Sequence, residues 1–374
     1  MAEPHFSEDD RKFIHQEINK ILDGALSMGP NVQAFEDEFA EMVGVKHAIA
    51  MNSCTSALEV ALGAYFIGTG DEVIVPAETF IATGMAVHLS GATPVFAEIS
   101  KSTFCLDLED VKARTSSYTR GIILVHMAGH ITSEIEEVKK YCDENNLFLI
   151  EDAAHAPGVK RNGQVAGSFG HVGCFSFYPT KVMTSGEGGM LTTNDDKVAS
   201  YARSLQHRGR DMNVGIEQYN LPGRNIRMTE MTALLGRVQL SHLKEYLDTR
   251  QRIAKIYKSE LQDDNRVQLI IPDDMSASSY WKVPILLNSK KNRRIVTEKM
   301  KKEFGISLDW AYQPALHLQP VFRGLYGTKP GDLPKSEDFL SRHICLPCHP
   351  QMTENDTRYV ICSLKEILDS LNDE

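Results

Sequence analysis

The sequence predicts an α/β protein with a mostly parallel sheet, followed by a smaller C-terminal α+β unit. Short apolar runs recur in the first half of the chain, helix-like stretches separate them, and the pattern changes after residue 228. The run 122–125 shows no polar alternation, which is typical of a strand that is covered on both faces. Alternating strands and helices favour a parallel sheet with helices packed on it.

Seven apolar runs are predicted as strands of one sheet. They cover residues 47–53, 72–79, 93–99, 121–129, 147–155, 173–179 and 188–195. The stretches between them, such as TSALEVALGAYFIG and TSEIEEVKKYCDENN, have the apolar spacing of helices that lie on a sheet. We therefore expect a seven-stranded sheet flanked by helices.

A different pattern begins after residue 228. Apolar residues at helical spacing continue to about residue 262, which indicates a long helix with at most one break. Beyond it we expect a strand over 279–287, a helix over 293–305 and a terminal helix that starts at Thr353. These elements predict a large α/β domain over residues 1–245, with an N-terminal helix, and a small α+β domain over 246–374.

The composition of the 374-residue chain is that of a globular protein, with 42% hydrophobic and 24% charged residues. Its formal charge of −10 argues against binding to nucleic acid or to an anionic membrane, although a local basic pocket for an anionic ligand remains compatible. No apolar run approaches the roughly 20 residues of a membrane span, and the acidic N-terminus does not look like a signal peptide.

Seven cysteines, an odd number scattered along the chain, favour reduced thiols and therefore a cytoplasmic protein. Cys345 and Cys348 form a lone C-x-x-C with proline inside it. A single pair of this kind is more often structural than metal-binding or redox-active, so we expect no metal site.

Polar residues follow three of the predicted strands, at the edge where ligands bind to open parallel sheets. Asp152 follows the strand that ends near residue 150, and the strand after 173 leads through Ser176 to Lys181. The first strand runs into Thr55 and Ser56, directly before a helix. A carboxylate, a lysine and a helix N-terminus are thus expected at one edge.

This combination suits pyridoxal phosphate, which needs a lysine for its Schiff base, a carboxylate at its ring nitrogen and an anion site for its phosphate. Lys181 and Asp152 would fill the first two roles, and the turn at 54–56 would bind the phosphate through helix N–H groups. Each signal alone is weak, since a Ser or Thr before a helix is more often a plain N-cap.

Other phosphate loops are not indicated. The first strand is not followed by G-x-G-x-x-G, and G-x-x-x-x-G-K-[ST] does not occur. GEGG at 186–189 precedes a strand, which is the wrong context for either loop.

The sequence resembles the DegT/DnrJ/EryC1/StrS sugar aminotransferases, which are fold-type-I, aspartate-aminotransferase-like enzymes that depend on pyridoxal phosphate. The resemblance covers essentially the whole chain and centres on EDAAH at 151–155 and the segment 167–195. It implies that Lys181 carries the Schiff base and that Asp152 contacts the pyridine nitrogen. It also implies that Ser176, Thr55 and Ser56 contact the phosphate.

Three further residues are assigned to the cofactor by the resemblance. Phe80 matches an aromatic residue that stacks on the ring, although a phenylalanine after a strand is more often a core residue. Asn225 matches an asparagine that reaches the cofactor phosphate of the neighbouring subunit, which implies a homodimer with shared active sites. His155 stands where the family usually has glutamine beside the ring hydroxyl, and Cys54 stands where glycine is common.

The substrate side is less defined by the sequence. His207, Tyr312 and His317 match family segments near the sugar site, each with a surface or structural role as the alternative. The segment 126–130 lacks the aromatic residue that is common in the family's corresponding loop, and this difference suggests a role in substrate choice.

The resemblance implies a transaminase that moves an amino group from an amino acid, expected to be L-glutamate, to a keto or aldehydo sugar. The cofactor would alternate between pyridoxal phosphate, covalently bound to Lys181, and pyridoxamine phosphate. By the same resemblance, the acceptor would be a nucleotide-linked sugar, a sugar phosphate or a sugar acid. The product would be an amino sugar for a surface polysaccharide or a natural product.

Two other functions are compatible with parts of the pattern. A sugar dehydratase of the same family would carry histidine at the Schiff-base position, where this chain has Lys181. A catalytically silent cofactor-binding scaffold or regulator is the alternative from another class. The absorbance of the protein with added cofactor and glutamate distinguishes the enzyme from the scaffold.

Overall fold

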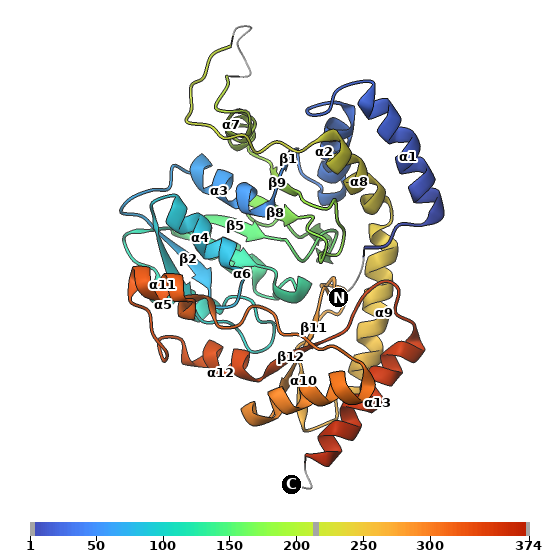
Figure 1. Ribbon diagram of the computed structural model, residues 1–374. Coiled ribbons are helices and arrows are strands. Elements are labelled where there is room, and N and C mark those ends of the chain that lie inside the picture. Colours follow the sequence, from blue (N-terminus) through green and yellow to red (C-terminus); the bar gives the residue numbers. More distant parts are fainter. Residues whose placement is uncertain (1–3, 212–216, 372–374) are drawn as a thin grey trace.

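The computed structural model describes residues 4–211 and 217–371. A seven-stranded sheet lies at its centre, with the strand order β1-β9-β8-β5-β4-β2-β3 (Figure 1). The strands are β1 (His47–Met51), β2 (Glu72–Pro76), β3 (Thr93–Ala97), β4 (Thr119–Val125), β5 (Phe148–Asp152), β8 (Val172–Ser176) and β9 (Gly189–Thr193). Only β9 runs antiparallel to its neighbours. The predicted α/β class is confirmed, and each strand overlaps one of the seven predicted runs.

Helices cover both faces of this sheet. The helices of the N-terminal part are α1 (Glu8–Leu22), α2 (Pro30–Val43), α3 (Cys54–Ala64), α4 (Ile81–Leu89), α5 (Leu108–Arg114), α6 (Ile135–Glu144) and α7 (Asp196–Gln206). Residues of α2, α5 and α6 share one apolar cluster, and residues of α3, α4 and α7 share another. Along β1, Ala48 and Ala50 belong to the first cluster while Ile49 and Met51 belong to the second. Both faces of the strand are therefore buried, which explains its unbroken apolar run.

The predicted long helix is two helices, α8 (Glu230–Ser241) and α9 (Leu243–Leu261), with the break at His242. The second sheet is antiparallel, in the order β10-β11-β12, with β10 (Val267–Leu269), β11 (Val283–Leu287) and β12 (His343–Leu346). Together with α9, the helices α10 (Lys290–Phe304) and α13 (Glu354–Ser370) form an apolar cluster with this sheet. Thr353 caps α13 as predicted, accepting a hydrogen bond from the Asp356 N–H at 3.1 Å.

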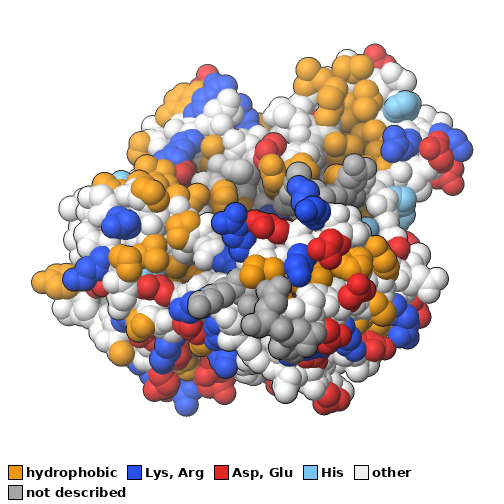
Figure 2. All heavy atoms as spheres, turned by 60° about the horizontal axis from the view of Figure 1, so that its bottom comes forward, with side chains coloured by type: hydrophobic (Ala, Val, Ile, Leu, Met, Phe, Trp, Pro, Cys, Tyr) orange, Lys and Arg blue, Asp and Glu red, His pale blue; other side chains and the backbone are white. Residues whose placement is uncertain are grey.

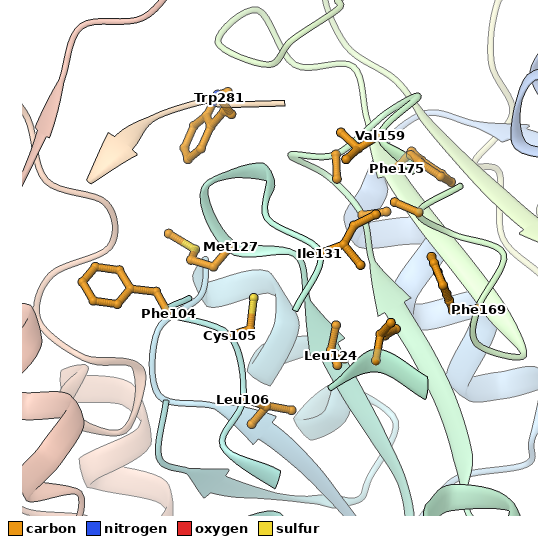
Figure 3. Close-up of a cluster of buried hydrophobic side chains, with 14 of the residues drawn as sticks. Phe104, Cys105, Leu106, Leu124, Met127, Ile131, Val159, Phe169, Phe175 and Trp281 are labelled. Atoms are coloured by element: carbon orange, nitrogen blue, oxygen red, sulfur yellow. The ribbon is translucent and has the colours of Figure 1, made fainter. Parts of the chain in front are cut away.

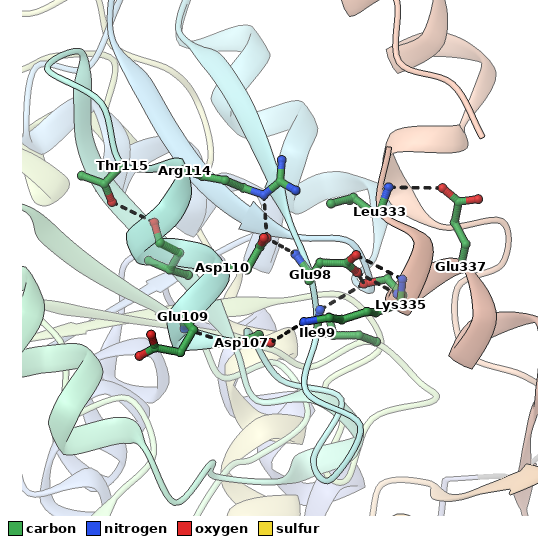
Figure 4. A network of polar contacts seen from close by, with 12 residues as sticks. Glu98, Ile99, Asp107, Glu109, Asp110, Arg114, Thr115, Leu333, Lys335 and Glu337 are labelled. Carbon is green, nitrogen blue, oxygen red and sulfur yellow. Dashed lines mark hydrogen bonds and ion pairs between the residues drawn. The ribbon is translucent and has the colours of Figure 1, made fainter. Parts of the chain in front are cut away.

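Part of the C-terminal segment returns to the large sheet. The short elements here are η2 (Leu316–Leu318), α11 (Pro320–Tyr326) and α12 (Pro334–Arg342). Phe322 and Leu333 belong to the apolar cluster of α3 and α4. Glu98, just after β3, accepts hydrogen bonds from the N–H groups of Lys335 and Ser336 at 3.1 and 2.7 Å, which ties the start of α12 to the sheet (Figure 4). The predicted division after residue 245 stays a prediction.

Three short elements complete the described chain: η1 (Met127–Gly129), β6 (Lys160–Arg161) and β7 (Gln164–Val165). Charged side chains of both signs intermix with apolar ones on the face shown in Figure 2. Across the described ranges, no helix is both long enough and apolar enough to cross a bilayer. All seven cysteines are free thiols. Cys345 is buried within β12, and Cys348 is buried two residues after the end of this strand.

Candidate active site

A cavity of about 1060 Å³ lies at the carboxyl ends of the central strands, against the C-terminal part of the chain. The large sheet and its helices contribute most of the residues predicted for the cofactor. From the C-terminal part, Trp281, Lys282, Trp310 and Tyr312 complete the wall. The predicted residues that line the cavity are Thr55, Phe80, Asp152, His155, Ser176, Lys181 and Tyr312.

Lys181 follows β8 through a tight turn. Its N–H donates to the carbonyl of Tyr178 at 2.9 Å, and Pro179 occupies the second turn position, which its fixed φ favours. Burial lowers the pKa of Lys181 to about 8, and the charge of Asp152 partly opposes this effect. A substantial neutral fraction of this amine is therefore present near pH 8, as a nucleophile or a base requires.

Asp152 ends β5 and is buried. Its carboxylate accepts hydrogen bonds from the Thr83 hydroxyl at 3.0 Å and from the Ala154 N–H at 3.3 Å. Burial raises the pKa of Asp152, while the Lys181 cation and these hydrogen bonds lower it. The carboxylate is thus oriented beside the amine and favours a positive charge nearby.

The N-terminus of α3 forms another part of the wall. Ser53 is the N-cap, and its hydroxyl accepts from the Ser56 N–H at 3.1 Å. Ser56 in turn donates to the side chain of Asn52 at 2.8 Å, and within the described ranges it is not part of the cavity wall. Thr55 does line the cavity, so it is the better-placed hydroxyl for an anion at this helix end. The phosphate contact of Ser56 stays a prediction.

Aromatic rings gather next to Lys181. His155 stacks on Trp281 with ring centroids 3.8 Å apart, and its Nε2 lies 3.0 Å from the hydroxyl of Tyr312. Burial, followed by the charge of Lys181, holds the pKa of His155 well below its usual range. The imidazole is therefore neutral, and one of its nitrogens always carries a lone pair.

Phe80 is 53% exposed at the start of α4, and its ring centroid lies 5.7 Å from that of Tyr312. The ring is therefore free to meet a ligand in the cavity, and it is not the core residue that its position after a strand suggests. Ser176 also faces the cavity, at the end of β8, where it accepts a weak hydrogen bond from the Tyr178 N–H at 3.4 Å.

The remaining predicted residues lie elsewhere among the described parts of the chain. Asn225 is exposed and forms a backbone bridge with His207, whose Nδ1 lies 2.8 Å from the Arg227 guanidinium. His317 is fully buried and lies 3.1 Å from Glu337. Of the three predicted substrate residues, only Tyr312 lines the cavity.

Several residues of the site were not predicted from the sequence, among them Thr83, Trp281, Lys282 and Trp310. Thr83 carries a local signal, because it lies shortly after the predicted strand at 72–79. Trp281 and Lys282 stand in a predicted strand, about a hundred residues after Lys181 in the sequence. No local pattern connects them to Lys181.

The residues present fit pyridoxal phosphate. The cavity offers an amine, a buried carboxylate and a helix N-terminus. His155 Nδ1 is also buried without a hydrogen-bond partner among the described residues, so the site contains polar capacity that the chain itself does not satisfy. Lys181, Asp152 and the start of α3 would meet the aldehyde, the ring nitrogen and the phosphate.

Residues 8–365 match the model of the DegT/DnrJ/EryC1/StrS aminotransferase family. The GDP-perosamine synthase of Caulobacter vibrioides is 36% identical over 372 residues, covering 98% of each chain. The UDP-N-acetyl-3-dehydro-alpha-D-glucosamine 3-aminotransferase of Acidithiobacillus ferrooxidans is 33% identical, covering 94% of this chain and 92% of that protein.

A solved structure extends the similarity to the cofactor. NtdA from Bacillus subtilis, crystallised with bound PMP, matches with a TM-score of 0.89 and 25% identity, covering 97% of this chain and 83% of its own. The chain therefore belongs to the DegT/DnrJ/EryC1/StrS aminotransferase family and is a sugar aminotransferase of amino-sugar biosynthesis that uses pyridoxal phosphate and its pyridoxamine form.

Proposed function

We propose that this enzyme transfers an amino group from L-glutamate to the keto carbon of a nucleotide-linked sugar, with the cofactor held covalently by Lys181. The observation that carries the covalent assignment is a buried amine with a pKa lowered to about 8, in the same cavity as the buried carboxylate of Asp152. The nucleotide-linked acceptor is supported by relatives that are named for GDP-linked and UDP-linked sugars.

Each residue of the cavity has a distinct proposed role. When bound, pyridoxal phosphate supplies an electron sink for the carbanion that forms at the donor. Lys181 Nζ takes the proton from the donor's Cα as general base, because its neutral form is accessible near pH 8. Asp152 holds the proton on the pyridine nitrogen through its negative charge. Thr55 and Ser176 bind the phosphate, and Phe80 stacks on the ring.

His155 is proposed to hydrogen-bond the ring hydroxyl in place of glutamine. Its neutral imidazole offers a donor or an acceptor at that place, as an amide does. Lys181, in turn, argues against the dehydratase alternative, because a base that also holds the cofactor is what transamination needs. The alternative of a catalytically silent scaffold that only binds the cofactor is tested by the variant Lys181→Ala, described below.

We also propose a homodimer in which Asn225 serves the neighbouring subunit. Its exposure outside its own cavity supports this role. Apolar side chains near α1 and α2 are exposed as well, with Leu22 at 60% and Leu26 at 58%, as expected for a surface that a second copy covers. We place the enzyme in the cytoplasm because its seven cysteines are free.

The variant Lys181→Ala tests the assignment. We expect turnover with glutamate and a nucleotide-linked keto sugar to fall by at least about a thousandfold, because both the covalent link and the base are lost. Borohydride reduction and peptide mass spectrometry of the wild-type enzyme should place the cofactor on Lys181. The variant should keep its circular-dichroism spectrum and still bind pyridoxamine phosphate.

Lys282→Ala is the matched control, because Lys282 lines the same cavity and pairs with Asp309. It should retain the covalent cofactor. A Lys181→Ala enzyme that still carries reducible cofactor, or still turns over, would contradict the proposal. For the acceptor, the pyridoxamine form is mixed with nucleotide-linked and free keto sugars, and return of the visible band should require the nucleotide.

A further inference from the structure

The segment before β11 is fastened to the loops of the large sheet. The Ile131 N–H donates to the carbonyl of Ala277 at 2.9 Å, and His130 Nδ1 lies 2.7 Å from the Ser278 hydroxyl. The Ser279 N–H donates to the carbonyl of Gly129 at 3.1 Å. Although this segment leads into the second sheet, its hydrogen bonds are to the loop that follows β4 of the large sheet.

Trp281 follows directly on this segment and is only 7% exposed. Figure 3 shows its ring at the edge of the apolar cluster that includes Met127, on the segment that leads into β11. The backbone N–H of Trp281 donates to the Ser279 hydroxyl at 3.2 Å, and that hydroxyl donates to the carbonyl of His155 at 2.5 Å. The main chain at Trp281 is therefore fixed relative to the loop that carries His155.

Three contacts of the indole involve Lys181, its neighbour Thr180 and His155. The indole Nε1 donates to the carbonyl of Thr180 at 2.6 Å, one residue before Lys181. Its ring stacks on His155 with an interplanar angle of 10°. The amine of Lys181 lies over the same ring, 4.7 Å from its centroid.

These contacts complete the anchoring of the lysine. The backbone N–H of Lys181 closes the preceding turn onto Tyr178, and the indole binds the carbonyl of Thr180 within the same turn. A hydrogen bond from a rigid, buried indole fixes this peptide, so the long lysine side chain starts from one defined position. The ring then limits where its amine can lie.

We propose that Trp281 is a positioning residue for cofactor attachment. Its indole N–H orients the Thr180–Lys181 peptide, and its ring holds the Lys181 amine and His155 on one side of the cavity. This inference rests on the proposed attachment of pyridoxal phosphate to Lys181. The two parts of the indole have separable effects. Loss of the N–H disturbs the lysine alone, while loss of the ring disturbs both the lysine and His155.

The test measures two quantities on the purified apo-enzyme and its variants. One is the rate at which the visible band of covalently attached pyridoxal phosphate appears, which requires Lys181. The other is the affinity for pyridoxamine phosphate by calorimetry, which requires no lysine bond. Trp281→Phe keeps an aromatic ring without the N–H, so attachment should slow about threefold to tenfold while pyridoxamine-phosphate affinity stays within about twofold.

Trp281→Leu removes the stacking ring as well. Attachment should slow by more than about tenfold, and pyridoxamine-phosphate affinity should fall about threefold to tenfold. Trp310→Phe is the matched control, because Trp310 is the other tryptophan of the chain and also lines the cavity. It should leave the attachment rate and the pyridoxamine-phosphate affinity as in the wild type.

Two outcomes would overturn the inference while the proposed function stands. In the first, Trp281→Phe attaches the cofactor as fast as the wild type although Lys181→Ala does not attach it. In the second, Trp281→Phe weakens pyridoxamine-phosphate binding as much as it slows attachment, which indicates a general structural role. Attachment that persists in Lys181→Ala would instead overturn the proposed function itself.

Discussion

Lys181 and Asp152 show how burial and charge act in opposite directions on one amine. Burial favours the neutral lysine, and the carboxylate favours the charged one. The result is a pKa of about 8, below the ordinary 10.5 of lysine. Since only the neutral amine attacks an aldehyde, the rate of cofactor attachment should rise with pH and level off above about pH 8.

Asp152→Asn tests this balance. The amide keeps the size of the side chain but removes the charge that raises the pKa of Lys181, so the midpoint of the pH–rate curve should move down by about one pH unit. The measurement is stopped-flow absorbance at saturating pyridoxal phosphate. Turnover should also fall about a hundredfold or more, because a neutral amide does not hold the ring nitrogen protonated.

Asp309→Asn is the control for this prediction. Asp309 also lines the cavity, but its charge pairs with Lys282 and it is not among the groups that shift the pKa of Lys181. The midpoint of the pH–rate curve of Asp309→Asn should equal that of the wild type. An unchanged midpoint in Asp152→Asn, or an equal shift in both variants, would show that Asp152 does not set the lysine's pKa.

At the scale of elements, the site depends on how closely β9 approaches the N-terminus of α3. A Cβ atom on Gly189 would lie 2.3 to 2.5 Å from the backbone of Ser53 and Cys54. Backbone atoms cannot move aside as a flexible side chain can. Glycine at the first residue of β9 is therefore what lets this strand pass behind the predicted phosphate turn.

Gly189→Ala should push the strand and the turn apart. We expect a loss of about 1–3 kcal/mol in the free energy of unfolding and a weaker affinity for pyridoxamine phosphate, by about tenfold. Denaturant unfolding and calorimetry measure the two effects. Gly324→Ala is the control, since a Cβ on that residue of α11 meets no atom within 4 Å, and both quantities should stay close to wild type. Equal behaviour of the two variants would contradict this account.

The elements also show what local sequence predicts. The seven strands of the large sheet have apolar runs because both of their faces are buried, and the sequence predicts all of them. The helix α12 was not predicted. The N–H groups of Lys335 and Ser336 bind Glu98, which lies more than two hundred residues away in the sequence, and the N-cap Leu333 has no side chain that could cap the helix. The one local signal of a helix start is Pro334 at the first position.

At the scale of the whole molecule, the proposed homodimer makes a specific prediction about Asn225. If each active site combines Lys181 of one subunit with Asn225 of the other, then Lys181→Ala and Asn225→Ala are each strongly impaired alone. A mixed dimer of the two contains one intact site and one site that lacks both residues. Random reassociation should therefore restore about a quarter of the wild-type activity.

The measurement mixes the two variants after mild dissociation and follows turnover with time. Reassociated samples of each single variant serve as controls and should remain impaired. Full activity of Asn225→Ala, or the absence of any recovery on mixing, would contradict a shared site. Sedimentation of each variant checks that the dimer itself persists.

The sequence by itself determined the seven strands of the large sheet, their alternation with helices along the chain, and the residues that follow the strand ends. Burial on both faces gives an apolar run, and the carboxyl edge of a parallel sheet brings Asp152, Thr55 and Lys181 together. The sequence did not identify the substrate residues in the same way. His207 and His317 were predicted near the sugar site, but the structure buries His317 against Glu337 and places His207 beside Arg227.

Only the tertiary structure decided what surrounds the lysine. Trp281 reaches the carbonyl of Thr180 from a segment about a hundred residues further along the chain, and Tyr312 reaches His155 from still further away. Such contacts depend on how the second sheet docks on the first, and periodicity records only which face of an element is buried. The pKa of Lys181 likewise follows from burial, which no stretch of sequence around it specifies.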